Sequence, residues 1–501
     1  MSDRVEAFSS RWAMMLAMLG MAVGTGNIWR FPRIAATNGG GSFLVAWVVF
    51  LLLWSVPLIL VEFAMGKAAR RGTVGAFARI AGERYAWMGG WVAWCTVAIL
   101  FYYSVVMGWC LRFLIASATS AVGWSAELPG TAPGALWTSF TGSGWQPLLM
   151  HAAAIALGAF VVARGVRGIE RAARVLMPCL FLLVVLLAIR AVTLPGAERG
   201  LNFLFTPNWS DLADYRIWIA ALTQNAWDTG AGWGLILTYA VYLRAREDTA
   251  LNGFLLGFGN NSVSLLAGIL VLCTVFAIRP DAASEIVGAG NEGLTFIWVP
   301  QLFATMPAGG FFMILFFLAL FFAAWTSLIS MVELAVRVLV DAGARRTHAI
   351  LWVAIAGFLC GAPSALSLRF FGNQDFVWGV GLMLSGFFFA FAVVRYGVRR
   401  FREEFVNGPG SDIRIGRWWD YAIVFCLVEA TVLVVWWFAQ AAKGGWAAAL
   451  DPFSSFSVGT VLLQWGVVLA VLIALNRWLV RRSATPAPGA DALGPPPASI
   501  P

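Results

Sequence analysis

The stretch that decides the fold is residues 20–32, which read Gly20-Met21-Ala22-Val23-Gly24-Thr25-Gly26-Asn27-Ile28-Trp29-Arg30-Phe31-Pro32. It places glycines and an arginine inside a run that is otherwise apolar enough to cross a membrane. A helix in lipid is interrupted only where protein, ligand or ion takes up the freed backbone groups, since each unsatisfied group costs several kcal/mol. The break therefore predicts a binding site.

The composition predicts an all-α membrane protein. The 501 residues are 60% hydrophobic and 12% charged, and a span needs about 20 apolar residues. Twelve transmembrane helices are expected, with starts near Trp12, Ser42, Met88, Pro147, Ala172, Ile217, Leu251, Gly310, Ala349, Trp378, Tyr421 and Thr460.

Arginines predict the orientation. They cluster between the second and third expected spans and again between the fourth and fifth, and the alternation continues along the chain. Basic connections face the cytoplasm, so both termini are expected inside. The net charge of +9 is then mainly an orientation signal, which argues against a nucleic-acid partner.

A second break lies in the sixth expected span, where Asn225–Gly234 reads NAWDTGAGWG. If the first ten spans form two halves of five, the two breaks occupy equivalent positions. Paired interruptions predict a transporter site at the interface of an inverted repeat. The alternative is that these glycines only let helices pack closely.

The chain divides into four expected parts: residues 1–11 as a cytoplasmic N-terminal segment, 12–400 as a ten-helix transport core, 401–482 as helices 11 and 12 with the preceding loop, and 483–501 as a disordered cytoplasmic tail. The outer connection around 282–301 is expected to carry short helices and to act as a lid.

The first break offers two kinds of ligand. Carbonyls freed between Gly20 and Val23 suit a monovalent cation, whereas the amides of Thr25 and Gly26 begin a new half-helix whose positive end suits a carboxylate. Thr326 and Ser327 supply further oxygens. Hydroxyls in apolar spans also bond the preceding turn, which is the structural alternative for this pair.

These motifs resemble the neurotransmitter:sodium symporter family, in its bacterial amino-acid-transporting branch with the leucine-transporter fold. The resemblance covers nearly the whole chain, and the matching segments are AVGTGNIWRFP from Ala22, NGGGSF from Asn38, RGIER from Arg167, GLNFLFTP from Gly200, the second break and the Thr326-Ser327 segment.

The resemblance implies two sodium sites. The first would use Ala22, Asn27, Asp228 and Asn260, and the second would use Gly20, Val23, Ala323, Thr326 and Ser327.

The resemblance also implies a substrate site. The substrate carboxylate would meet Thr25, Gly26 and Tyr103, and its ammonium would meet Ser327 and carbonyls near Ala22 and Trp227. Side-chain walls would come from Ile99, Trp227, Trp233 and Met331, with Gly230 leaving space. A small or medium neutral amino acid is expected. Monoamine-transporting relatives carry an acidic residue at the position of Gly24, so Gly24 argues against an amine.

Two gates follow from the same resemblance. Arg30 and Asp375 would close above the substrate, with Tyr103 and Trp227 as the aromatic lid, and Arg4 with Asp341 would form the cytoplasmic latch.

Asp228 departs from the family pattern, which has Ser or Thr at this position. We expect its carboxylate to replace a chloride ion, with Gln224 and Ser264 as hydrogen-bonding partners. The alternatives are that Asp228 binds sodium directly or exchanges a proton.

The expected function is sodium-coupled import of a neutral amino acid by alternating access across a bacterial inner membrane, without covalent chemistry. The rival function is a sodium-dependent receptor or regulator that binds but does not transport.

Overall fold

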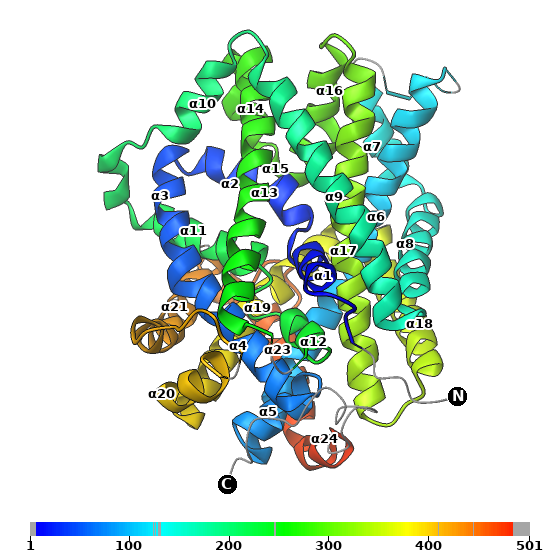
Figure 1. The fold of residues 1–501 in the computed structure, drawn as a ribbon. Coiled ribbons are helices and arrows are strands. Elements are labelled where there is room, and N and C mark those ends of the chain that lie inside the picture. The colour runs from blue at the N-terminus through cyan, green and yellow to red at the C-terminus, as the bar shows by residue number, and fades with distance from the viewer. Residues whose placement is uncertain are drawn as a thin grey trace.

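The computed structural model describes residues 7–123, 125, 127–128, 132–244, 247–408, 410–443 and 445–483. Every regular element within these ranges is a helix, as expected. The long helices run between two faces of the molecule (Figure 1): one carries α5 (Thr73–Ile80) and α24 (Asn476–Ser483), and the other carries α10 (Ala197–Phe205), α14 (Ala283–Gly288) and α16 (Val299–Ala304). We call these the α5 face and the α14 face.

Eight helices among the described residues are continuous, long and apolar enough to cross a membrane. They are α3, η2 and α4 together (Gly41–Ala69), η3 with α6 (Glu83–Ala121), α9 (Gly165–Val192), α13 (Thr249–Ile278), α17 (Gly309–Asp341), α18 (Arg346–Leu366), α19 (Leu368–Tyr396) and α21 (Trp418–Ala441).

Three bent helix pairs raise the described candidates to eleven. They are α1 (Arg11–Ala22) with residues Gly26–Thr37, bent by 52°; Pro133–Gly142 of α7 (Ala132–Gly142) with α8 (Gln146–Val162), bent by 86°; and α23 (Val458–Ala474) with α24, bent by 61°. The sixth expected span is the pair α11 (Tyr215–Asp228) and α12 (Leu235–Ala240), whose halves are each too short to cross alone.

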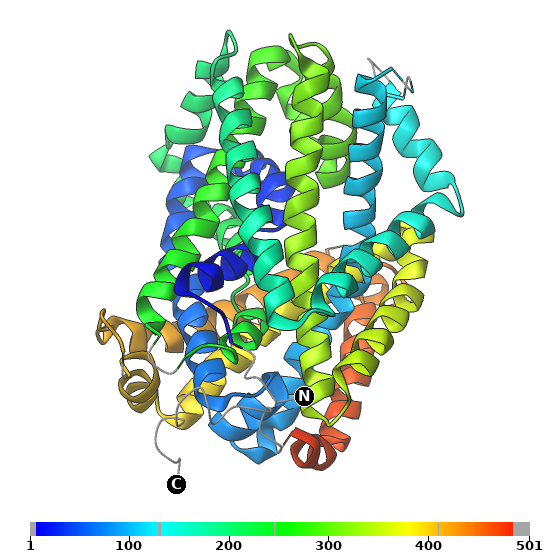
Figure 2. The same ribbon diagram turned by 45° about the vertical axis from the view of Figure 1, so that its right-hand side comes forward.

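The first break follows from its local sequence. Ser10 caps α1 by accepting from the amide of Ala13, and α1 ends at Ala22, where Val23 turns extended with φ −74° and ψ 99°. The chain then re-enters as a π-helix, η1 (Gly26–Arg30), and continues as α2 (Phe31–Thr37). The dark-blue helix α1, which leads into the break, lies at about mid-height of the molecule (Figure 2).

The second break depends on glycines in left-handed conformations. Gly232 has φ +87°, and a Cβ there would lie 3.1 Å from the Cα of Gly386. Neighbouring side chains take up the freed backbone groups: Glu62 accepts from the amides of Gly232 at 2.7 Å and Leu237 at 3.0 Å. The Thr96 hydroxyl donates to the Trp233 carbonyl at 2.6 Å. The break is therefore an ordered part of the structure.

The segment expected to form an outer lid does carry short helices. They are η5 (Pro280–Ala282), α14, α15 (Gly290–Glu292), η6 (Gly293–Trp298) and α16. The other short elements are η4 (Trp209–Ala213), α20 (Val398–Phe401), η7 (Arg402–Val406) and α22 (Trp446–Ala449).

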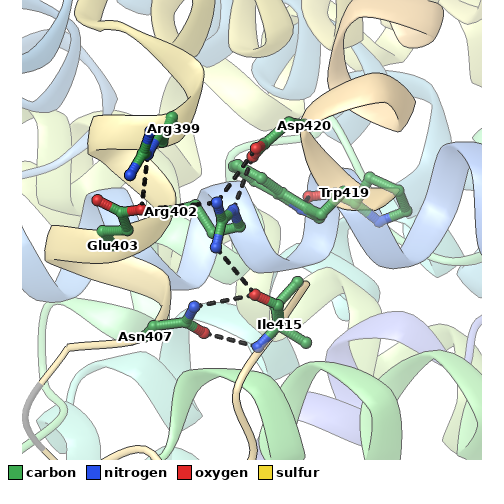
Figure 3. Close-up of polar contacts among 8 residues, drawn as sticks. Arg399, Arg402, Glu403, Asn407, Ile415, Trp419 and Asp420 are labelled. Carbon is green, nitrogen blue, oxygen red and sulfur yellow. Dashed lines mark hydrogen bonds and ion pairs between the residues drawn. The ribbon is translucent and has the colours of Figure 1, made fainter. Parts of the chain in front are cut away.

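The connection from α19 to α21 is held by a polar cluster (Figure 3). Arg402 donates to both oxygens of Asp420, at 2.8 and 3.2 Å, and to the carbonyl of Ile415 at 3.2 Å. Asn407 exchanges two hydrogen bonds with the backbone of Ile415, at 2.9 and 2.7 Å. Trp419 is fully buried and donates to the Pro57 carbonyl, so the connection is fastened to α4.

Candidate functional site

A cavity of about 410 Å³ lies where the two breaks meet. Its walls come from the first break, α6, α11, α17 and α19, and it extends toward the α14 face as far as Asn291 and Glu292. Most of the residues expected at the site line it, namely Ala22, Gly24, Thr25, Gly26, Asn27, Arg30, Tyr103, Trp227, Asp228, Gly230, Trp233, Ser327, Met331 and Asp375.

Other expected site residues lie outside the cavity lining. Ile99 is fully buried in α6 and does not reach the cavity. The remaining ones are buried behind the cavity wall: Gln224, Asn260, Ser264, Val23, Ala323 and Thr326, with Gly20 beside them.

The backbone at Gly24 lies close to two hydroxyl groups. A Cβ at this position would lie 2.9 Å from Ser327 Oγ and 3.0 Å from Tyr103 Oη. Tyr103 Oη accepts from the Thr25 amide at 3.2 Å. The Ser327 hydroxyl donates to the carbonyls of Met21 at 3.3 Å and Val23 at 3.5 Å. One amide, two hydroxyls and two carbonyls therefore lie close together here, on the side of Gly24 where another residue would carry its side chain.

A continuous polar chain connects the first break to Asp228. Asn27 accepts from the Gly24 amide at 2.8 Å and donates to Asn260 Oδ1 at 3.0 Å and Ser264 Oγ at 2.7 Å. Ser264 donates in turn to Asp228 Oδ2 at 2.6 Å.

Part of this chain has unused hydrogen-bonding capacity. Within the described ranges, Asp228 Oδ1 is buried without a hydrogen-bond partner, as are both polar side-chain atoms of Gln224. Asp228 Oδ1 also lies 3.1 Å from a Cβ built on Gly26, directly beside the broken backbone. An orphaned buried carboxylate oxygen beside amide and carbonyl groups suits a bound cation.

The residues expected at the second sodium site are neighbours in space. The Thr326 hydroxyl donates to the carbonyls of Phe322 at 2.9 Å and Ala323 at 3.1 Å, as the structural alternative predicts. A Cβ on Gly20 would lie 3.2 Å from Thr326 Cβ. Ser327 reaches the Val23 carbonyl, so the five expected residues surround one region between α1 and α17.

Aromatic and charged side chains cover the cavity toward the α14 face. The Arg30 guanidinium lies over the Trp227 ring, 4.8 Å from its centroid. No ion pair joins Arg30 to Asp375 in the part of the chain that the structure describes, although both line the cavity. Trp227 packs against α19 so closely that a Cβ on Gly379 would lie 2.1 Å from its Cζ2.

The expected cytoplasmic latch lies only partly within the structure, because Arg4 is outside the described residues. Asp341 is engaged by other groups: it pairs with Arg337 at 2.6 Å and accepts from the Gly72 amide at 2.6 Å. On the same side of the cavity, Phe8 packs edge-on against Tyr239 at 6.1 Å. The expected disordered tail also lies outside the described residues, apart from Ser483.

Sequence reasoning missed several lining residues, including Arg33, Tyr102 and Glu292. Arg33 could have been found, because it follows Arg30 by one helical turn and shares its face. Glu292 carried no sequence signal, since only the folded α14 to α16 segment brings it to the cavity.

Comparison with known proteins identifies the family. The profile described as "Sodium:neurotransmitter symporter family" matches residues 5–129 and 137–482. An uncharacterized sodium-dependent transporter of Bacillus subtilis, YhdH, is 32% identical over 85% of this chain and 96% of its own length. The sodium-dependent serotonin transporter of Drosophila melanogaster is 29% identical over 81% of this chain and 72% of its own length.

A solved structure has the same fold. MhsT in complex with L-phenylalanine superimposes with a TM-score of 0.74 and 28% sequence identity, over 86% of this chain and 99% of MhsT. The expected leucine-transporter fold with broken helices is thereby confirmed, and so is the expectation of a multi-pass transporter rather than an enzyme. The chain belongs to the sodium:neurotransmitter symporter family, whose members are sodium-dependent transporters.

Proposed function

We propose that this protein couples sodium flow to the import of a small or medium neutral amino acid by alternating access. The observation that carries the proposal is the cavity at the two breaks, where backbone amides, hydroxyls and carbonyls meet an apolar compartment. A zwitterion needs such a mixed site, because its charged ends must be hydrogen-bonded when they leave water. The likeness to MhsT bound to L-phenylalanine supports the same class of substrate.

The substrate carboxylate is assigned to the amides of Thr25 and Gly26 together with Tyr103 Oη, which already contacts Thr25. The ammonium is assigned to Ser327 and to carbonyls at Ala22 and Trp227. The apolar walls are Trp233, Trp227 and Met331, with space at Gly230. Two tryptophans reduce the room for a side chain, which favours a compact substrate.

Two sodium sites are proposed. The first comprises Ala22, Asn27, Asn260 and Asp228, and the second comprises Gly20, Val23, Ala323, Thr326 and Ser327. The orphaned Asp228 Oδ1 supports the first, and the grouping of hydroxyls and carbonyls around Ser327 supports the second.

Asp228 is proposed to supply the negative charge that chloride supplies in other members. Its Ser264 hydrogen bond at 2.6 Å and the neighbouring Gln224 support this role. A fixed carboxylate offsets sodium charge in a site of low dielectric, where an uncompensated ion is costly. Direct sodium ligation or proton exchange by Asp228 are the alternatives.

Uptake into proteoliposomes tests the function. A sodium-dependent thermal-shift screen of the common amino acids first identifies a ligand, because a ligand that binds the folded state stabilises it by mass action. Accumulation of that ligand under an inward sodium gradient is expected. Sodium-dependent binding without accumulation would instead indicate a receptor.

Two measurements address Asp228. Replacement of chloride by gluconate should leave uptake unchanged, and a large loss would contradict the chloride-substitute role. Asp228→Asn should abolish the pH dependence of uptake only if this carboxylate exchanges the proton. We also propose that the protein lies in a bacterial inner membrane with both termini in the cytoplasm.

A further inference from the structure

A second hollow lies toward the α5 face and shares no lining residue with the cavity at the breaks. Its volume is about 360 Å³, and three separate segments build it: the residues before α1, the first turns of α9, and the connection after α12. Its lining residues are Ala7, Phe8, Ser9, Arg167, Glu170, Arg171, Arg174 and Arg244.

The hollow has a strong excess of positive charge. Four arginines and one glutamate line it, which leaves three positive charges among the described lining residues. Glu170 is buried and already occupied, because it accepts from the Ser9 amide at 2.9 Å, from the Ser9 hydroxyl and from Arg174. Arg167, Arg171 and Arg244 are exposed at the surface. Glu170 is the one acidic side chain among the described lining residues, so it offsets only one of the four arginine charges.

The position of the hollow along α9 fixes its depth in the membrane. Arg167, Arg171 and Arg174 precede the apolar part of this span. Immediately after them, Val175, Phe181 and Leu182 are exposed apolar side chains, with half or more of their surface accessible. Such side chains face lipid tails in a spanning helix, so the arginines lie at the level of the headgroups.

We propose that this hollow binds the phosphate of an anionic phospholipid headgroup. Guanidinium groups bind phosphate through paired, charge-assisted hydrogen bonds, which match three converging arginines better than a neutral headgroup does. The apolar flank of α9 provides a place for the acyl chains. The site lies outside the transport cavity and does not depend on the proposed substrate or ions.

The hollow is also linked to the first broken helix. Arg174 donates to Ser9 Oγ at 2.6 Å, and Ser9 directly precedes Ser10, the residue that caps α1. The segment contributes Ala7, Phe8 and Ser9 to the lining, so the hollow has all of its walls only while this segment is docked beside α9. A phosphate that binds the complete hollow therefore favours the docked position of α1, because a ligand shifts an equilibrium toward the state it binds more tightly.

Thermal stability of the purified full chain tests the proposal with three additives: dioctanoyl phosphatidylglycerol, dioctanoyl phosphatidylcholine and inorganic phosphate. We expect a saturable rise in melting temperature with phosphatidylglycerol alone. The paired variant Arg171→Gln with Arg244→Gln should lose this rise, whereas Arg481→Gln, an exposed arginine on the same face, should keep it.

Several results would overturn the proposal. An equal rise with phosphatidylcholine would show general lipid stabilisation, and an equal rise with inorganic phosphate would indicate a free-anion site. A full rise in the paired variant would show that these arginines are not involved. If the paired variant does not fold, the single variants Arg171→Gln and Arg171→Lys replace it, and the lysine variant should retain more of the response because it keeps the charge.

Discussion

At the scale of single residues, Gly24 is a position where an added side chain would meet two groups of the proposed substrate site. The space that a side chain would need is occupied by Ser327 Oγ and Tyr103 Oη. Both groups are assigned to the substrate, so a methyl group here would displace the ligands rather than fill an empty volume.

Gly24→Ala is therefore expected to weaken amino-acid binding about tenfold or more, which corresponds to about 1.4 kcal/mol. Gly310→Ala is the matched control, because a Cβ at Gly310 of α17 meets nothing within 4 Å. Titration of the ligand against melting temperature measures both variants. Unchanged affinity in Gly24→Ala would contradict the assigned substrate position.

Glu429 is a second single residue whose substitution should affect stability, because its carboxyl group is buried. Its side chain is buried in α21, and among the described residues neither carboxyl oxygen accepts a hydrogen bond, since the neighbouring Cys426 thiol donates to the Leu53 carbonyl. Replacing an unsatisfied buried polar group by an apolar one of similar shape is neutral or stabilising. Glu429→Met should therefore keep or raise the melting temperature, whereas Glu429→Asp should not raise it. A marked loss of stability in the methionine variant would reveal a partner of this carboxyl.

At the scale of elements, the ordered connection between α19 and α21 is held by buried Arg402 and its half-buried partner Asp420. The neighbouring pair of Arg399 and Glu403 is different, since both side chains are largely exposed at 71% and 50%. The two pairs share one short segment (Figure 3), which allows a direct comparison of buried and exposed charges.

Asp420→Asn removes the charge that holds Arg402, and we expect a loss of about 1.5 to 3 kcal/mol in the free energy of unfolding, the range for hydrogen bonds to charged groups. Arg399→Gln should have no measurable effect, because its pair with Glu403 is exposed and exposed pairs contribute little. Unfolding in detergent with added denaturant measures both. Equal losses in the two variants would mean that burial does not set the contribution of the pair.

At the scale of the whole molecule, the proposed second sodium site joins segments from distant parts of the chain, α1 and α17. An ion shared by them would tighten the bundle as a whole. The same two segments surround the substrate corner, so ion and substrate would act on one arrangement of helices.

Sodium should accordingly raise the melting temperature relative to potassium. At a sodium concentration of 100 times the dissociation constant, the free energy of unfolding should rise by about 2.7 kcal/mol. Thr326→Val should reduce this response because it removes a ligand oxygen at nearly constant volume. Thr274→Val is the control, since Thr274 is also buried and bonds its own helix, donating to Leu270 at 2.7 Å. An equal sodium response in both variants would show that Thr326 is not a ligand of the ion.

The sequence predicted the helical class, the two breaks and nearly half of the cavity-lining residues, because glycine spacing and apolar runs are local signals. It placed Ile99 in the wall of the side-chain pocket, and this buried residue of α6 is not one of the residues that line the cavity. It paired Asp341 with Arg4, which lies outside the described residues; within them, Asp341 contacts Arg337 one turn earlier in its own helix. Glu292 was missed because only tertiary packing brings its loop to the site. Side-chain direction and loop placement are properties of the assembled bundle.

The tight contact between Trp227 and Gly379 limits the order in which this site can be re-engineered. Any side chain at position 379 would collide with the indole, 2.1 Å from its Cζ2. A smaller residue must therefore first replace Trp227, and only then can α19 accept a new side chain. The reverse order passes through an intermediate with an overpacked core, which typically costs about 1 to 3 kcal/mol. A mutational path toward larger substrates accordingly has one permitted first step at this contact, on α11 rather than on α19.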